Sequence, residues 1–454
     1  MVVIKWSFGN SICSKKQIEM IKLELKNIVR NPLVSILVLF LFIFILFASY
    51  NGKSRVNKQL EGIELVKNKE NTFYTNHKNN LKSIEEGTKK TPKRVFEDPT
   101  NPVAMGNYYG GTYLTVTPAP LSVISNGQSD IFPYYSKVNI GGTNAEKNND
   151  NFENPMNIAT GGFDLAFVFV FILPLLIIAF SYNILSSERE QGTLRLLLSM
   201  PINIKTWLLK KIVFRYFFLV LLISAILTLS LAIIGVNFSN VTYLILLSSI
   251  ALYTLFWFGL AFLINLLNKS SSQNIILLLG TWLLFVLIIP SFVNILASSV
   301  YPSPSRVEYI TSKRAIEKEF EKKEEAILQK FYEENPSEKD KENNTTNRFR
   351  KYWNKNFILL NEKNKFMDAF ESKYENQSMN QREFANKLSW FSPAIIFQNT
   401  MNEIAETDTQ HYLSFQNSTK IFQKEWTEYF YSKYKNHQKL TVEDFNNFPK
   451  QKNN

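Results

Sequence analysis

Residues 33–49 read LVSILVLFLFIFILFAS, an apolar run without a single charged side chain. Comparable runs occupy residues 163–185, 212–236, 242–267 and 275–300. Each run approaches or exceeds the ~20 residues with which an α-helix crosses a hydrocarbon core about 30 Å thick. The chain of 454 residues is therefore predicted to be an all-α polytopic membrane protein with five transmembrane helices, at 32–50, 163–185, 212–236, 242–267 and 275–300.

The sequence around the first run favours a permanent anchor. The run begins after a basic segment, and no small-residue cleavage site follows it, so we do not expect it to be removed as a signal peptide. Cys13 is the only cysteine, which excludes an intramolecular disulfide and a zinc site built from several thiolates.

The positive charges next to the apolar runs predict the orientation. The net charge is +12, and Lys22, Lys26 and Arg30 stand just before the first run. Lys and Arg in short segments beside spans mark the cytoplasmic side and contact anionic lipid. We therefore expect residues 1–31 and 186–211 inside, residues 51–162 and 301–454 outside, and no nucleic-acid partner.

Residues 1–31 are predicted to form a cytoplasmic amphipathic helix. Ile18, Ile21, Leu25 and Ile28 recur at helical spacing on one face, as in helices that lie at a membrane surface. The alternative is an ordinary cytoplasmic lead-in to the first span.

The two long polar segments are predicted to be extracytoplasmic domains. Residues 51–162 begin with a lysine-rich stretch, expected to be helical from about 53 to 89, and continue with turn formers between 108 and 138 that indicate irregular structure with a few strands. Residues 301–454 contain several amphipathic pieces, which predict a helical bundle.

The most specific stretch follows the second run. Residues 186–201 read SSEREQGTLRLLLSMP, a charged turn, a glycine, a short amphipathic helix and a proline stop. Ser187 can cap a helix there, and Glu188 and Glu190 suit its positive N-terminal end. A short helix presented between two spans has the shape that docks into a groove of a partner, although such turns are also purely structural in many membrane proteins.

The pattern Glu-x-Glu-x-Gly-Thr-Leu followed by Leu-Leu-Ser-x-Pro resembles the cytoplasmic loop of ABC-2-type permease subunits of ATP-binding-cassette exporters. Residues 119–135, 161–164 and 388–393 resemble a bacterial subgroup of these permeases with large extracytoplasmic insertions. The resemblance implies that residues 186–211 form the loop that couples the permease to an ATPase. Its expected contact residues are Glu188, Arg189, Glu190, Gly192, Thr193, Leu194, Leu197 and Pro201.

The same resemblance implies the partners and the location. It implies a separate ATP-binding-cassette ATPase subunit that carries ATP and Mg, a second permease subunit in a homo- or heterodimer, and a place in the inner (cytoplasmic) membrane of a bacterial cell. The N-terminal helix would be the interfacial connecting helix of the family. Permeases of this subgroup usually add a sixth span after the second outer domain, whereas this chain ends at Asn454 without one, so we expect either a truncated polypeptide or a last span supplied differently.

The motifs of common enzymes are missing from the sequence. It has no G-x-x-x-x-G-K-[ST] loop to hold ATP phosphates, no H-E-x-x-H motif and no G-x-S-x-G motif. His77, His411 and His437 are far apart in the chain. The protein itself is therefore expected to be no enzyme and to carry no cofactor or metal. The apolar runs also lack central charged residues, which argues against a proton- or ion-coupled transporter.

Pro174 and Pro290 fall inside the second and fifth runs. A proline removes one backbone hydrogen bond, so both positions are predicted helix kinks that either shape a cavity and permit rocking or are merely tolerated.

Two functions remain open from the sequence. The first is the permease subunit of an ABC-2-type exporter, which moves a hydrophobic or amphipathic substrate with ATP hydrolysed by a partner. The second is a non-transporting membrane scaffold or mechanotransmitter whose outer domains bind envelope proteins.

Overall fold

The computed structural model describes residues 24–26, 30, 32–108, 110–129, 132–143, 162–199, 203–237, 240–302, 306–343 and 346–451. Most of the predicted N-terminal helix at 1–31 and the predicted loop residue Pro201 lie outside these residues.

Five helical stretches in the described residues are long and apolar enough to cross a membrane, which confirms the prediction of an all-α polytopic membrane protein. The first is the beginning of α2 (Pro32–Glu85). The second comprises α4 (Leu165–Phe167), η4 (Val168–Ile172), α5 (Leu173–Ser181) and α6 (Ser186–Glu190). The third and fourth are α8 (Ile204–Ile233) and α9 (Asn240–Leu266), and the fifth comprises α10 (Ser271–Leu283), η5 (Leu284–Ile288) and α11 (Ile289–Val300).

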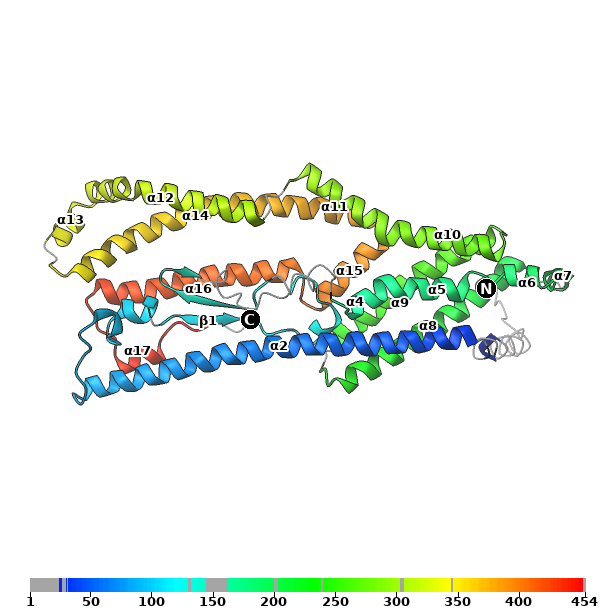
Figure 1. The fold of residues 1–454 in the computed structure, drawn as a ribbon, viewed down its shortest axis with the longest axis horizontal. Helices are drawn as coiled ribbons and strands as arrows, with labels where there is room; N and C mark the ends of the chain where they lie inside the picture. The colour runs from blue at the N-terminus through cyan, green and yellow to red at the C-terminus, as the bar shows by residue number, and fades with distance from the viewer. Residues whose placement is uncertain are drawn as a thin grey trace, which may run out of the picture.

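α2 runs along most of the length of the molecule (Figure 1). The first span and the lysine-rich stretch, predicted as separate helices, are thus one continuous helix. Gly52 stands where η3 (Ser122–Ile124) crosses this helix, and a Cβ there would lie 2.0 Å from the carbonyl oxygen of Val123. Arg55, one turn further on, donates to the carbonyl oxygens of Ser122 and Ser125. A glycine and an arginine therefore fix the first outer segment against α2.

The first outer segment contains the short helices η1 (Val95–Glu97) and η2 (Ala104–Tyr108) and three strands, β1 (Thr112–Thr115), β2 (Tyr135–Asn139) and β3 (Gly142–Thr143). The strands form an antiparallel sheet in the order β1-β2-β3, with Thr112 opposite Val138. This agrees with the expected mixture of turns and a few strands.

The second outer segment is helical, as predicted. It comprises α12 (Arg306–Glu334), α13 (Pro336–Asn343), α14 (Arg348–Leu388), η6 (Ser389–Phe391), α15 (Pro393–Ile404), α16 (Thr409–Lys435) and α17 (Val442–Asn446). α12 and α14 run beside each other away from the spans, and α13 lies at the far end of the molecule (Figure 1).

The two outer segments share one hydrophobic core, although the sequence analysis treated them as two domains. Val138 and Ile140 from the sheet region pack in the same buried cluster as Phe422, Trp426 and Phe430 of α16. The indole Nε1 of Trp426 donates to the carbonyl oxygen of Gly106, at 3.0 Å. A three-stranded sheet needs a cover for its apolar face, and α16 provides it.

Candidate functional site

Two short helices, one at the end of the second span and one between it and the third span, lie at the end of the molecule opposite α13 (Figure 1). These are α6 and α7 (Leu194–Ser199), joined by a turn through Gly192. Gly192 has φ +78°, in the left-handed region that favours glycine, and nothing lies within 4 Å of the position of a Cβ there. Its place in the motif therefore follows from backbone conformation. α8 begins at Ile204, with Asn203 accepting from the backbone N–H of Lys205, so the third helix starts earlier than the predicted 212.

Glu188 ties the turn to the third span. One carboxylate oxygen accepts from the Thr193 hydroxyl at 2.6 Å, across the glycine turn. The other carboxylate oxygen lies 3.2 Å from the ammonium of Lys211 in α8. Glu188 and Thr193, both in the motif, thus close the turn and connect it to a span.

Arg189 and Glu190 tie the same turn to the connection between the fourth and fifth spans. Arg189 donates to the backbone carbonyl of Asn268 at 2.8 Å and also to its side chain. Glu190 accepts from both the backbone N–H and the hydroxyl of Ser271, each at 2.9 Å. Ser186 and Ser271 share a further hydrogen bond of 2.8 Å between their hydroxyls. The charged residues of the motif therefore hold the turn to the first residue of α10.

α7 exposes apolar side chains to solvent. Leu194 and Leu197 are half-buried, and Leu194 packs against the core of the spans. Leu196 and Leu198 are 65% and 57% exposed. Leu196 and Leu198 are two residues apart and lie on different sides of α7, so the short helix offers an exposed leucine on each of two sides to a partner.

Three residues outside the predicted site form a network of ion pairs and hydrogen bonds beside the loop. Glu24 is buried, and its carboxylate accepts from Arg215 at 2.7 and 3.0 Å and lies 3.8 Å from Lys211. Arg215 also donates to the carbonyl oxygen of Phe180. Lys211 thus lies between Glu24 and Glu188 and connects the N-terminal segment to the loop. The sequence signal for this network was the position of Lys211 and Arg215 among the four cations in the first twelve residues of the third helix.

Pro174 and Pro290 each follow a π-helical stretch, η4 and η5. The carbonyl groups near each proline accept hydrogen bonds from other elements. The Tyr253 hydroxyl donates to Val170 at 3.0 Å, and the Ser392 hydroxyl donates to Phe285 at 2.6 Å. The prolines therefore coincide with points where side chains of distant elements attach to the second and fifth spans.

The three histidines lie in separate places. His77 packs on Phe73 in α2, His411 contacts Asp408, and His437 lies 2.8 Å from Arg350. In the part of the chain that the structure describes, no group of three or more His, Cys, Asp or Glu residues is arranged to hold a metal ion.

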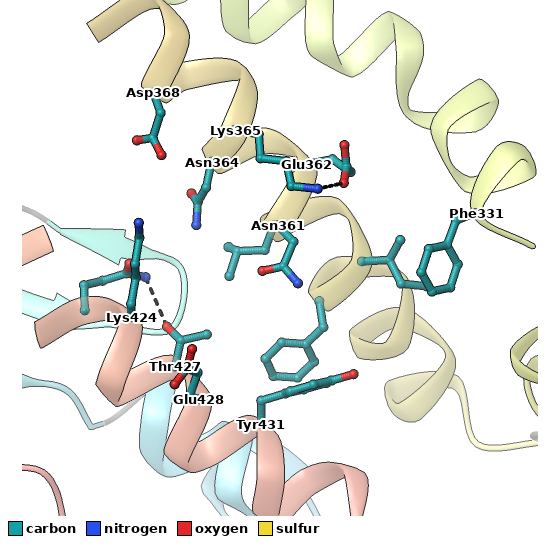
Figure 2. A pocket seen from close by; sticks show the side chains of 14 residues that line it. Phe331, Asn361, Glu362, Asn364, Lys365, Asp368, Lys424, Thr427, Glu428 and Tyr431 are labelled. Carbon is teal, nitrogen blue, oxygen red and sulfur yellow. Dashed lines mark hydrogen bonds and ion pairs between the residues drawn. The ribbon is translucent and has the colours of Figure 1, made fainter. Parts of the chain in front are cut away.

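The two outer segments, joined by their shared core, are called the outer body below. Within it, a cleft of about 450 Å³ separates α14 from α16. Asn364 and Asp368 of α14 face Lys424 and Glu428 of α16 across it (Figure 2). Aromatic residues line one end, where the ring centroids of Phe357 and Tyr431 are 4.7 Å apart.

Ion pairs join α14 and α16 beyond the residues that line the cleft. Lys420 lies 2.8 Å from Glu371 and 3.1 Å from Glu375. Burial by itself lowers the pKa of Lys420, but hydrogen bonds and attraction to the two carboxylates outweigh it, so the pKa is raised and the lysine stays charged. The cleft is thus a polar opening held between two fixed contacts.

Comparison with known proteins identifies the family of the chain. The protein-family model described as "ABC-2 family transporter protein" matches residues 18–433, which include the five spans, α7, the first outer segment and the second outer segment up to the end region of α16. No curated protein and no solved structure matches the chain. Because the family match covers most of the sequence, the protein belongs to the ABC-2 family of transporter proteins, as a multi-pass membrane permease of an ATP-binding-cassette transporter.

Proposed function

We propose that this permease uses α6 and α7 to receive the movement of a separate ATP-binding-cassette ATPase and that it thereby moves a substrate outward across the inner membrane of a bacterial cell. ATP and Mg would be bound by the ATPase. A second permease subunit, identical or similar, would complete the membrane part. The apolar walls of the spans favour a hydrophobic or amphipathic substrate.

The observation that carries this proposal is the way the loop is attached. Leu196 and Leu198 are exposed on α7, while Glu188, Arg189 and Glu190 connect the same turn to α8 and α10. A force applied to the exposed leucines would be passed to the third and fifth spans through these contacts. Charged side chains with several hydrogen bonds resist displacement more strongly than single neutral bonds do.

The test is co-purification with an ATP-binding-cassette ATPase subunit, recognised by its phosphate-binding-loop peptide in mass spectrometry. L196E/L198E replaces both exposed leucines by charges, and we expect it to lower ATPase association at least 10-fold. V307E is the matched control, because Val307 is also exposed, at 75%, but lies in α12 of the outer body. Equal association of both variants would contradict the docking assignment.

E190Q separates docking from coupling. It keeps the shape of Glu190 but removes the charge that Ser271 binds, so we expect the ATPase to stay bound while vanadate-sensitive transport per ATP hydrolysed falls. Unchanged transport per ATP would argue against a role for this contact in coupling.

The second candidate is the membrane scaffold or mechanotransmitter, and the cleft between α14 and α16 is the observation that favours it. The cleft carries both signs of charge and amide groups, which suit a polypeptide segment of an envelope protein. Failure of any ATPase to associate with the wild-type permease, together with retention of an envelope protein by the outer body, would favour this function.

A further inference from the structure

The turn η6 exposes two aromatic side chains next to the fifth span. Trp390 is 81% exposed and Phe391 is 65% exposed. Exposure of so much apolar surface to water is unfavourable, at about 25 cal/mol per Å², and such patches mark contact with a partner or a membrane. From its sequence, this turn was predicted to lie outside the membrane with the rest of 301–454.

A hydrogen bond gives the depth of the turn. Ser392, the residue after η6, donates to the carbonyl oxygen of Phe285, which belongs to the candidate span Ser271–Val300. At about 1.5 Å per residue, Phe285 lies ~21 Å along the helix from Ser271, whereas the hydrocarbon core is about 30 Å thick. With Ser271 at the cytoplasmic edge of this core, Phe285 lies in its outer half, and so does the turn that is attached there.

Contacts that reach the second span through Tyr253 give the same level. Phe397 of α15 stacks on Tyr253 of α9, with ring centroids 4.5 Å apart and an interplanar angle of 7°. The hydroxyl of that tyrosine donates to Val170, which lies about 8 Å from Leu165, the first residue of α4, at the helical rise of about 1.5 Å per residue. Phe397 and Met401 are buried in the same apolar cluster as residues of the spans. α15 therefore enters the membrane part from the outer side.

Pro290 explains why the chain attaches at this point. It has no backbone N–H, so the preceding π-helical turn leaves a carbonyl group without its helical donor. A polar group inside the hydrocarbon region needs a partner, and the Ser392 hydroxyl supplies it to Phe285. Ser392 also caps α15 by accepting from the N–H of Ile395. One serine thus starts α15 and fastens it to the fifth span.

We propose that residues 389–404 re-enter the bilayer and that Trp390 and Phe391 contact lipid in its outer leaflet. The surface continues along the fifth span, where Phe292 and Ile295 are 60% and 64% exposed. Tryptophan suits this level, because its ring is apolar and its N–H can reach the wet interface. The inference is independent of the coupling proposal, since it concerns the opposite side of the membrane.

Spin labelling in lipid nanodiscs tests the proposal on the full chain. Cys13 is the only cysteine, so C13S/F391C carries one label on the turn. C13S/L252C gives the lipid reference, because Leu252 is 67% exposed on the fourth span, and C13S/Y352C gives the aqueous reference, because Tyr352 is 55% exposed in α14. We expect the label at 391 to be accessible to oxygen and protected from a water-soluble nickel complex, as at 252.

Two outcomes would overturn the proposal. Nickel accessibility equal to that at 352 would place the turn in water. Protection from both oxygen and nickel would place it in a protein interface, such as one with a second copy of the chain.

A second measurement needs no label. W390F removes one indole, and brominated lipids should quench the emission of W390F by a smaller absolute amount than that of the wild type. If brominated lipids quench the wild type and W390F by the same absolute amount, Trp390 does not contact lipid.

Discussion

At the scale of the residue, Gly192 is the position whose backbone decides the shape of the loop. Its φ of +78° is accessible to glycine and tolerated by asparagine, but it costs a β-branched residue about 1–2 kcal/mol. We expect G192V to loosen the hydrogen bond between Thr193 and Glu188 and to lower transport per ATP several-fold, while G192N stays near wild type. The measurement is vanadate-sensitive transport by the reconstituted complex, with thermal melting as a check that the spans remain folded.

The two variants can be compared because a Cβ at residue 192 meets no neighbouring atom in either of them. No atom lies within 4 Å of the added Cβ, so any difference between them comes from the backbone. Equal loss in G192N and G192V would mean that the absence of a side chain, and not the left-handed conformation, is what the loop requires.

At the scale of the element, Asp444 holds α17 on the outer body. One of its carboxylate oxygens accepts from the backbone N–H and hydroxyl of Thr441, at 2.9 and 3.0 Å, and the other lies 2.7 Å from Lys433. Burial by itself raises the pKa of Asp444, but Lys433 and Thr441 outweigh it and lower the pKa below its ordinary value.

A lowered folded pKa sets the direction of the pH dependence. The stabilisation by Asp444 is present above its unfolded pKa of about 3.9 and is lost as the pH falls through the folded pKa. D444N should therefore be less stable than wild type by about 1 kcal/mol at pH 7, and the difference should shrink to zero in strong acid. Urea midpoints from tryptophan emission over a pH series measure this, with D340N in α13 as an exposed control. A gap that stays constant down to pH 2 would contradict the assignment.

At the scale of the whole molecule, the two outer segments are expected to unfold together because they share Trp426. This side chain is 1% exposed, so W426A should cost about 3–5 kcal/mol. It should raise amide exchange in β2, although that strand lies almost 300 residues earlier in the chain. I421A, on the same helix at a side chain 62% exposed, is the control. Exchange that rises in α16 alone would show that the segments are energetically separate.

Local features of the sequence predicted the spans and the motif well. A membrane span needs about 20 apolar residues in succession, and the runs at 163–185 and 242–267 meet that requirement without reference to the rest of the chain. The motif around Gly192 was likewise visible, because its turn and its short helix depend on neighbouring residues.

The partners of these features were not visible in the sequence. Ser271 and Lys211 are ordinary surface-type residues until packing of the spans brings them to Glu190 and Glu188. The contact of Arg55 in α2 with the carbonyl oxygen of Ser122 likewise joins residues 67 positions apart.

The sequence by itself therefore determined that the protein resides in the membrane, that it is mostly helical and that a glycine turn with a short helix follows the second span, since hydropathy and turn chemistry are properties of adjacent residues. Only the tertiary structure decided that the outer segments form one body, that Glu24 supports the loop and that Ser392 attaches α15 to the fifth span. Those contacts join residues more than 100 positions apart. Their formation depends on which buried polar groups need partners once the helices have packed.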